Sequence, residues 1–151
     1  MKTLFLTFIL LITLNGCSSD NSSDPFVPVT ITPVLIGKGF FSSEENLTPS
    51  NLVITNQVVW GQFLTQIDLI NNYSSTFSET NIDFNTYQVI AVIDSQRPDT
   101  GHSVNIDLIT ENENDITVNF SLQNSGSGFT EMIQPYHIVK IPKSPKPVVF
   151  Q

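Results

Sequence analysis

The sequence has little positive charge. Six Lys and Arg residues stand against 14 Asp and Glu, which gives a formal net charge of −8. Between Gly39 and Val139 the only fixed cation is Arg97. An acidic surface repels phosphate backbones, so we expect no nucleic-acid partner.

Cysteine and histidine are also scarce. Cys17 is the only cysteine, which excludes an intramolecular disulfide and a zinc site made of four cysteines. The two histidines, His102 and His137, lie far apart, and no carboxylate motif brackets them, whereas metal sites favour short repeated spacings. Asp99 and His102 share one loop, but two loop residues do not make a metal site. We expect no metal and no other cofactor.

Motifs of common enzymes are missing as well. The chain contains no G-x-S-x-G nucleophile elbow and no glycine-rich phosphate loop before a helix. A triad of Ser103, His102 and Asp99 is possible only on paper, because sequence neighbours on a strand point to opposite faces. We therefore expect no catalytic residues and a protein that is not an enzyme.

The most apolar stretch, Thr3 to Leu14, is too short to cross a membrane as a helix, which needs ~20 residues. It follows Lys2 and has the dimensions of the apolar core of a secretory signal. It ends in Leu14-Asn15-Gly16-Cys17, which resembles the bacterial lipobox. That resemblance implies a signal peptide over residues 1–16, cleavage after Gly16, and lipidation of Cys17. We expect a lipoprotein held to a membrane through Cys17.

Residues 17–33 predict a flexible tether. Ser18 to Pro33 is rich in Ser, Asp, Asn and Pro and has little to bury. Its acidic, serine-rich start resembles signals that send some Gram-negative lipoproteins to the cell surface, although a plain solvated linker is the alternative. The expected location is the cell envelope, at the outer membrane, with surface exposure as one option.

Residues 34–151 predict one β-rich domain with a single helix. Trp60, Phe63, Leu64 and Ile67 recur at the helical spacing i, i+3, i+4, i+7. Asn56 is a suitable N-cap, so the helix is expected over Gln57 to Leu69. The aromatic residues on this stripe are expected in the core.

Strand patterns dominate the rest of the domain. Tyr87 to Ile93 is almost continuously apolar, which predicts a central strand buried on both faces. Val104, Ile106 and Leu108 alternate with polar residues, as do the apolar residues of 116–122, which predicts an antiparallel hairpin with one wet face. Further strands are expected at Val34–Phe41, Leu52–Ile54, Tyr136–Ile141 and Val148–Phe150. Prolines bound the last two and favour edge positions. The predicted fold class is α+β, mainly β: an antiparallel sheet or sandwich of about six to eight strands with one packed helix.

Gln96 to Ser103 joins the central strand to the hairpin and is the candidate binding loop, because loops on a rigid sheet often carry binding. Its candidate partner-binding residues are Arg97, Pro98, Thr100, Gly101 and His102. Pro98 stiffens the turn and Gly101 permits a positive φ. The alternative is structural: Arg97 pairs with Asp94 or Asp99 in its own turn.

Five elements in order suggest a family. They are Trp60 on the helix, Asp83-Phe84, the apolar strand Val89–Ile93, the loop Arg97–His102 and the ending Pro135–Lys143, PYHIVKIPK. With these elements, Trp60 to Phe150 resembles the C-terminal domain of the protease complex subunit PrcB family. That family has an R-P-T-G-G-Y loop and ends in P-Y-H-V-V-x-I-P-K. In this chain His102 replaces the tyrosine and one glycine is missing.

The resemblance implies a non-catalytic cell-envelope protein that binds another envelope or secreted protein. In the named case it is an accessory subunit of a secreted protease complex. The alternative is a protease inhibitor that uses the Gln96–Ser103 loop, which resembles more distantly the N-P-T-T-G-Y loop of chagasin-type inhibitors. A small hydrolase is a third option, without a readable nucleophile–base pair.

Overall fold

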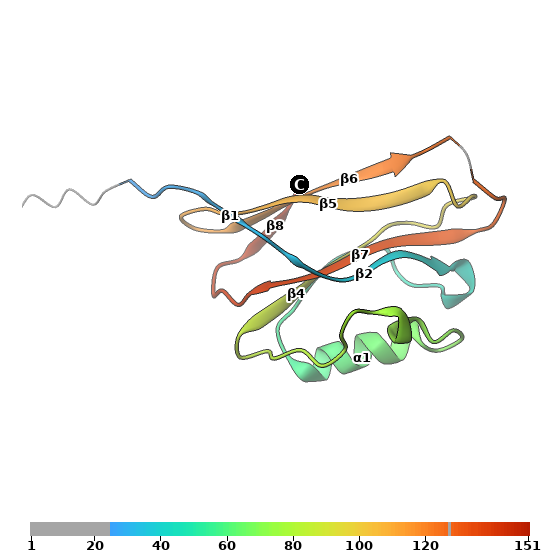
Figure 1. Ribbon diagram of the computed structural model, residues 1–151, viewed down its shortest axis with the longest axis horizontal. Coiled ribbons are helices and arrows are strands. Elements are labelled where there is room, and N and C mark those ends of the chain that lie inside the picture. Colours follow the sequence, from blue (N-terminus) through green and yellow to red (C-terminus); the bar gives the residue numbers. More distant parts are fainter. Residues whose placement is uncertain (1–24, 127) are drawn as a thin grey trace, which may run out of the picture.

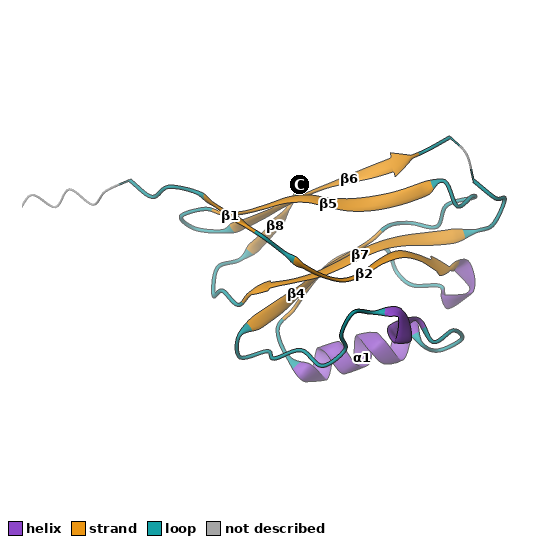
Figure 2. Cartoon of the chain, in the orientation of Figure 1, coloured by secondary structure: helices purple, strands orange, loops and turns teal. Residues whose placement is uncertain are grey.

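The computed structural model describes residues 25–126 and 128–151, so the predicted signal peptide (1–16) and Cys17 lie outside the described residues. The described chain forms three layers: two four-stranded sheets and one α-helix, α1 (Figure 1). Strands make up most of the regular structure (Figure 2). The predicted α+β, mainly-β class is therefore confirmed, in its sandwich form with one packed helix.

One sheet is central and the other is outer. The central sheet has the order β2 (Val34–Ser42), β7 (Ile133–Pro142), β4 (Tyr87–Ile93), β3 (Ser50–Ile54). The outer sheet has the order β1 (Val29–Ile31), β5 (His102–Glu111), β6 (Ile116–Asn124), β8 (Val148–Phe150). All paired neighbours are antiparallel except β6 and β8, which run parallel.

The first strand begins inside the segment that was expected to be a tether. Val29–Ile31 lies within residues 17–33 yet forms β1, which pairs with Ile109–Glu111 of β5. The segment alternates two β-branched apolar residues around Thr30, a strand pattern, and Ile31 packs against the core between the sheets. Ordered pairing begins at Val29, before the expected start of the domain at residue 34.

Helix α1 (Gln57–Ile67) covers the face of the central sheet that points away from the outer sheet (Figure 1). The predicted N-cap is confirmed, because Asn56 Oδ1 accepts a hydrogen bond from the Val59 N–H at 3.0 Å. Trp60 is fully buried, and its Nε1 donates to the Thr80 carbonyl at 2.8 Å. The helix ends two residues before the expected Leu69, because Asp68 is the C-cap and accepts from the Ser74 N–H.

The central strand is confirmed, but its neighbour β7 was expected at an edge and is not. β4 lies between β3 and β7, and Gln88 to Ile93 are buried. β7 is interior although it contains Pro135. Its pairing with β4 runs from Pro142, opposite Tyr87, to Tyr136, opposite Ile93. Pro135 lies opposite Asp94, beyond the end of β4, so its missing N–H falls outside this ladder. Only β8 occupies the edge position that its flanking prolines favoured.

The hairpin of β5 and β6 is confirmed, with one correction to its faces. The register shifts between Ile106 and Leu108, where Asp107 is an extra residue in a β-bulge. A bulge reverses the alternation beyond it, so Leu108 is 44% exposed while Ile109 is 1% exposed. The expectation that Leu108 shares a face with Val104 and Ile106 is therefore wrong.

Candidate functional site

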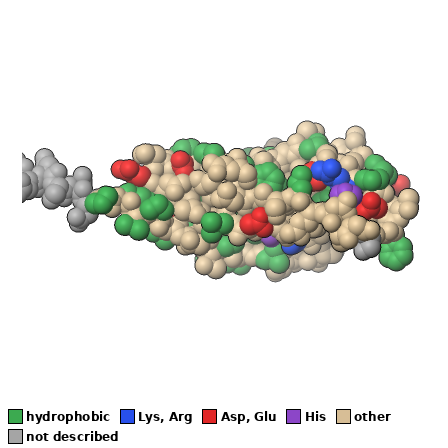
Figure 3. Space-filling model, turned by 90° about the horizontal axis from the view of Figure 1, so that it is seen from above, with side chains coloured by type: hydrophobic (Ala, Val, Ile, Leu, Met, Phe, Trp, Pro, Cys, Tyr) green, Lys and Arg blue, Asp and Glu red, His purple; other side chains and the backbone are tan. Residues whose placement is uncertain are grey.

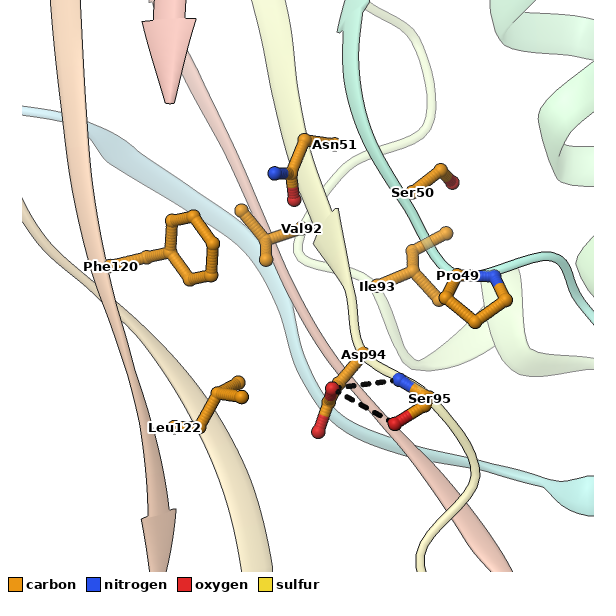
Figure 4. Close-up of a pocket in the computed structure, with 9 residues that line it drawn as sticks. All are labelled: Pro49, Ser50, Asn51, Val92, Ile93, Asp94, Ser95, Phe120 and Leu122. Atoms are coloured by element: carbon orange, nitrogen blue, oxygen red, sulfur yellow. Dashed lines mark hydrogen bonds between the residues drawn. The ribbon is translucent and has the colours of Figure 1, made fainter. Parts of the chain in front are cut away.

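The space between the two sheets is filled at one end and open at the other. The filled end holds an aliphatic cluster of Ile90, Ile109, Ile116, Val118, Val139 and Ile141. Toward the ends of β4 and β6 the sheets leave a groove of about 480 Å³ (Figure 4). Its lining is Pro49, Ser50, Asn51, Val92, Ile93, Asp94, Ser95, Phe120 and Leu122. A second cavity of about 250 Å³ shares Asp94 and Leu122 with this groove. We call this region the open end.

Arg97 and His102 both line the smaller cavity, so the structure brings two of the predicted site residues together. The other lining residues are Asp94, Leu122, Gln123 and Asn124. In the view of Figure 3, a cationic side chain, a histidine and acidic side chains gather toward one end of the molecule. The predicted loop therefore borders a cavity of the open end.

Arg97 is clamped by Asp94. Its Nε lies 2.7 Å from Asp94 Oδ2, and its Nη2 donates to Asp94 Oδ1 at 2.9 Å. Burial raises the pKa of the Asp94 carboxyl, but hydrogen bonds from Arg97 and from the Ser95 N–H outweigh it and leave the pKa below its usual value. The Arg97 guanidinium is thus paired within its own turn. This is the arrangement that the structural alternative for Arg97 predicted, with Asp94 as the partner.

Thr100 joins the candidate loop to the β6–β7 connection. The Thr100 N–H donates to the Phe129 carbonyl at 3.1 Å, and the Phe129 N–H donates to Thr100 Oγ1 at 2.9 Å. The Ser125 N–H donates to the Gly101 carbonyl at 2.9 Å. Gly128 packs so closely on Gly101 that an added Cβ would overlap the Gly101 nitrogen. We call residues 96–103 with residues 125–126 and 128–132 the paired-loop platform.

The remaining candidate residues of the loop are His102 and Pro98. His102 Nδ1 lies 3.1 Å from Asp99 Oδ1, which also accepts from the Gly101 N–H at 2.9 Å. Pro98 is exposed. The backbone of Arg97 exchanges two hydrogen bonds with Ile133, at 2.7 and 2.9 Å, so the loop is fixed at its start as well.

The sequence did not identify the most exposed apolar residue of this region. Phe129 is 84% exposed, and nearby in the chain Met132 is 47% exposed. Both the N–H and the carbonyl of Phe129 are hydrogen-bonded to Thr100. A lone aromatic residue after a glycine- and serine-rich run was the only sequence signal that could have drawn attention to it.

The second histidine lies between the sheets. His137 Nδ1 accepts a hydrogen bond from the Ile106 N–H at 2.8 Å, next to the bulge of β5. Burial and the nearby Lys38 charge lower the pKa of His137 to about 4, against an opposing effect of Asp107. His137 is therefore neutral at pH 7, and it links the two sheets.

Residues 25–126 and 128–151 contain no group of three or more His, Cys, Asp or Glu side chains arranged to hold a metal ion. In the same part of the chain, no helix is long and apolar enough to cross a membrane.

Comparisons of this chain with protein-family models, with curated proteins and with solved structures found no match. The resemblance to the PrcB family therefore stays a prediction from the sequence.

Proposed function

We propose that this protein is a lipid-anchored, non-catalytic interaction module of the cell envelope that binds another envelope or secreted protein at its open end. One observation carries the proposal. Phe129 is 84% exposed, while its N–H and its carbonyl are both hydrogen-bonded to Thr100. An exposed aromatic side chain on a fixed backbone suits a binding anchor, because little ordering entropy opposes association.

The position of the paired-loop platform also supports binding. Residues 25–28 reach β1 at one end of the domain, and the β6–β7 connection lies at the opposite end (Figure 1). If Cys17 is lipidated, as the lipobox resemblance implies, the platform faces away from the anchored end. A partner then reaches Phe129 without passing between the domain and the membrane.

The resemblance to the PrcB family favours a protease or a protease complex as the partner. It also makes the protein an accessory subunit within this proposal. Arg97, Pro98, Thr100, Gly101 and His102 then hold and border the contact surface. Thr100 has the most direct role, because it fixes Phe129 through two hydrogen bonds.

The test is site-specific photocrosslinking in intact cells that express the full chain. A photoreactive amino acid replaces Phe129, and the matched control places it at Leu69, which is 69% exposed and lies two residues after the end of α1. We expect one discrete crosslinked product from position 129 and none from position 69. No product from 129, or the same products from both positions, contradicts the proposal.

A second measurement distinguishes the inhibitor alternative. Purified protein is titrated into cysteine and serine protease assays. Inhibition that Phe129→Ser leaves intact, but that changes in the Gln96–Ser103 loop abolish, would replace the proposed function by inhibition. We expect no inhibition.

A further inference from the structure

The outer sheet has an edge that is only partly covered. β8 pairs with Ile116–Val118 of β6, and the next residue, Gln151, extends the contact to Phe120. The Phe120 N–H donates to the Gln151 carbonyl at 3.1 Å, and the Gln151 N–H donates to the Val118 carbonyl at 3.0 Å. β6 itself continues to Asn124. Its last residues thus run past the covered stretch.

The direction of the free backbone groups follows from strand geometry. Val118 and Phe120 point their N–H and carbonyl groups toward β8, and these directions alternate along a strand with period two. Leu122 and Asn124 therefore point the same way. No strand of the described residues pairs with this side of β6 beyond Phe120. The edge presents unpaired donors and acceptors, which is the template for strand addition.

This stretch also lacks the features that usually protect an edge. Phe120 to Asn124 (FSLQN) contains no charged residue and no proline, and no bulge is found in β6 there. On the opposite edge of the outer sheet, the corresponding part of β5 does have partners. There the Ile106 N–H is bonded to His137, and Lys38 Nζ donates to Asn105 Oδ1. Protection on one edge and its absence on the other indicate that the β6 edge is available for pairing.

The groove beside this edge specifies what would pair with it. The side chains of Phe120 and Leu122 point toward β4 across the groove, opposite Val92 (Figure 4). A strand added to β6 would place every second side chain over this groove of about 480 Å³. Five of the nine lining residues are apolar, and the only acidic one, Asp94, is paired with Arg97. The groove therefore suits an apolar side chain, and the net charge of −8 on the molecule disfavours an acidic segment.

We infer that the open end binds an extended segment of its partner as an added strand on the Phe120–Asn124 edge of β6, with an apolar side chain in the groove. The inference rests on the proposed function and adds the binding mode. A run of about five residues, roughly 16 Å, spans the edge. The segment then continues toward the paired-loop platform, because β6 leads directly into it.

The main test alters one backbone donor. Leu122→Pro removes the N–H that points away from β5, so the β5–β6 hydrogen bonds are kept, and proline is tolerated on edge strands. The matched control, Leu122→Val, keeps both the donor and an apolar side chain. Each variant is introduced into the full chain that carries the photocrosslinker at position 129. We expect Leu122→Pro to lower the crosslinked product by about tenfold or more and Leu122→Val to leave it within about twofold.

A second measurement covers the case in which Leu122→Pro fails to fold. The probe is a heptapeptide of alternating valine and threonine with a lysine at each end, at millimolar concentration, added to the full unmodified chain in detergent. Hydrogen exchange of the Leu122 amide is expected to slow about tenfold or more. The same peptide N-methylated at every second residue cannot donate along one edge and should give no protection.

The outcomes separate the two proposals. If Leu122→Pro folds, with an unchanged melting midpoint, and still crosslinks through position 129, strand addition is wrong while the proposed function stands. If position 129 gives no product but the peptide protects Leu122, the proposed function fails and the strand-binding edge remains. Absence of protection overturns the inference. So does a dimer in sedimentation experiments that Leu122→Pro dissociates, because the edge would then pair with a second copy.

Discussion

The two faces of the central sheet are built differently. The face toward α1 is covered by a continuous apolar layer rich in aromatic residues. In it Phe41 stacks on Tyr136 with ring centroids 4.0 Å apart, and Trp60 stacks on Phe63 at 5.5 Å. The face toward the outer sheet has an aliphatic core at one end and, at the other, the open end with its groove and the Asp94–Arg97 pair. One face of the central sheet is thus fully covered, whereas the other keeps an open groove at one end.

The largest loss of stability is expected from a change on the face of the central sheet that packs against α1. Trp60→Ala should lower the free energy of unfolding by about 3–5 kcal/mol, because it leaves a large cavity and removes the hydrogen bond to Thr80. Chemical denaturation measures the change, and Trp60→Phe is the milder control. An unchanged denaturation midpoint would show that this face does not carry the stability assigned to it.

The two ends of the sheet–sheet interface can be compared by a matched pair of truncations. Ile109→Ala at the filled end should destabilise by about 2–4 kcal/mol, since Ile109 is 1% exposed. Leu122→Ala at the open end should cost less than about 1 kcal/mol, because that side chain is 52% exposed. Equal losses would mean that the open end is packed like the rest of the core.

Much of the fold was predictable because periodicity and burial agree locally. The apolar run Tyr87–Ile93, the stripe of α1 and the cap at Asn56 each follow from a few neighbouring residues. The missed features depend on long-range pairing. The bulge at Asp107 moved Leu108 to the surface, and β7 is interior with Pro135 just beyond the last residue of β4 and Pro142 at the other end of the pairing. The local pattern of apolar and polar residues predicts neither feature.

The position of the candidate loop was predictable from the sequence, but its side-chain contacts were not. The QRPDTGHS loop does border a cavity, since a loop that leaves a buried strand has to emerge at an end of the sandwich. The partner of Arg97 stayed open between Asp94 and Asp99, because side-chain geometry decides it. Phe129 was missed because its fixed backbone depends on Thr100, which lies far from it in the sequence.

The buried histidine at the sheet–sheet interface predicts a pH dependence. The pKa of His137 is lowered from 6.5 to about 4 in the folded state, so the unfolded state binds more protons between these values. Stability is therefore fully present above about pH 6.5 and is lost as the pH falls toward 4. The expected loss is about 1–3 kcal/mol, measured as the urea midpoint against pH. In His137→Gln the part of the slope that belongs to this residue should disappear, and an unchanged slope would assign the dependence to other groups.

A small loss of stability is also expected at the rim of the open end, from breaking the Arg97–Asp94 pair. Arg97→Ala should lower the free energy of unfolding by about 1 kcal/mol at neutral pH, because the pair is bidentate but partly exposed. The pKa of the Asp94 carboxyl is lowered in the folded state, so this stabilisation is present above the ordinary value of 3.8 and is lost as the pH falls through the lowered pKa. The difference between the parent and Arg97→Ala should therefore shrink in acid. Arg97→Lys keeps the positive charge but cannot form the bidentate pair, so its free energy of unfolding should lie between those of the parent and Arg97→Ala.

The same variant decides whether Arg97 stabilises its turn or contacts the partner. If Arg97 acts through Asp94, the change in Arg97→Ala and that in Asp94→Asn should not add in the double mutant, because either one already removes the pair. Crosslinking from position 129 by the folded protein should then persist in Arg97→Ala and in Arg97→Ala/His102→Ala. A double mutant with the parent's melting midpoint and no crosslinked product would instead make Arg97 and His102 part of the contact surface. In that case the 250 Å³ cavity that they line, rather than the β6 edge alone, would receive the partner.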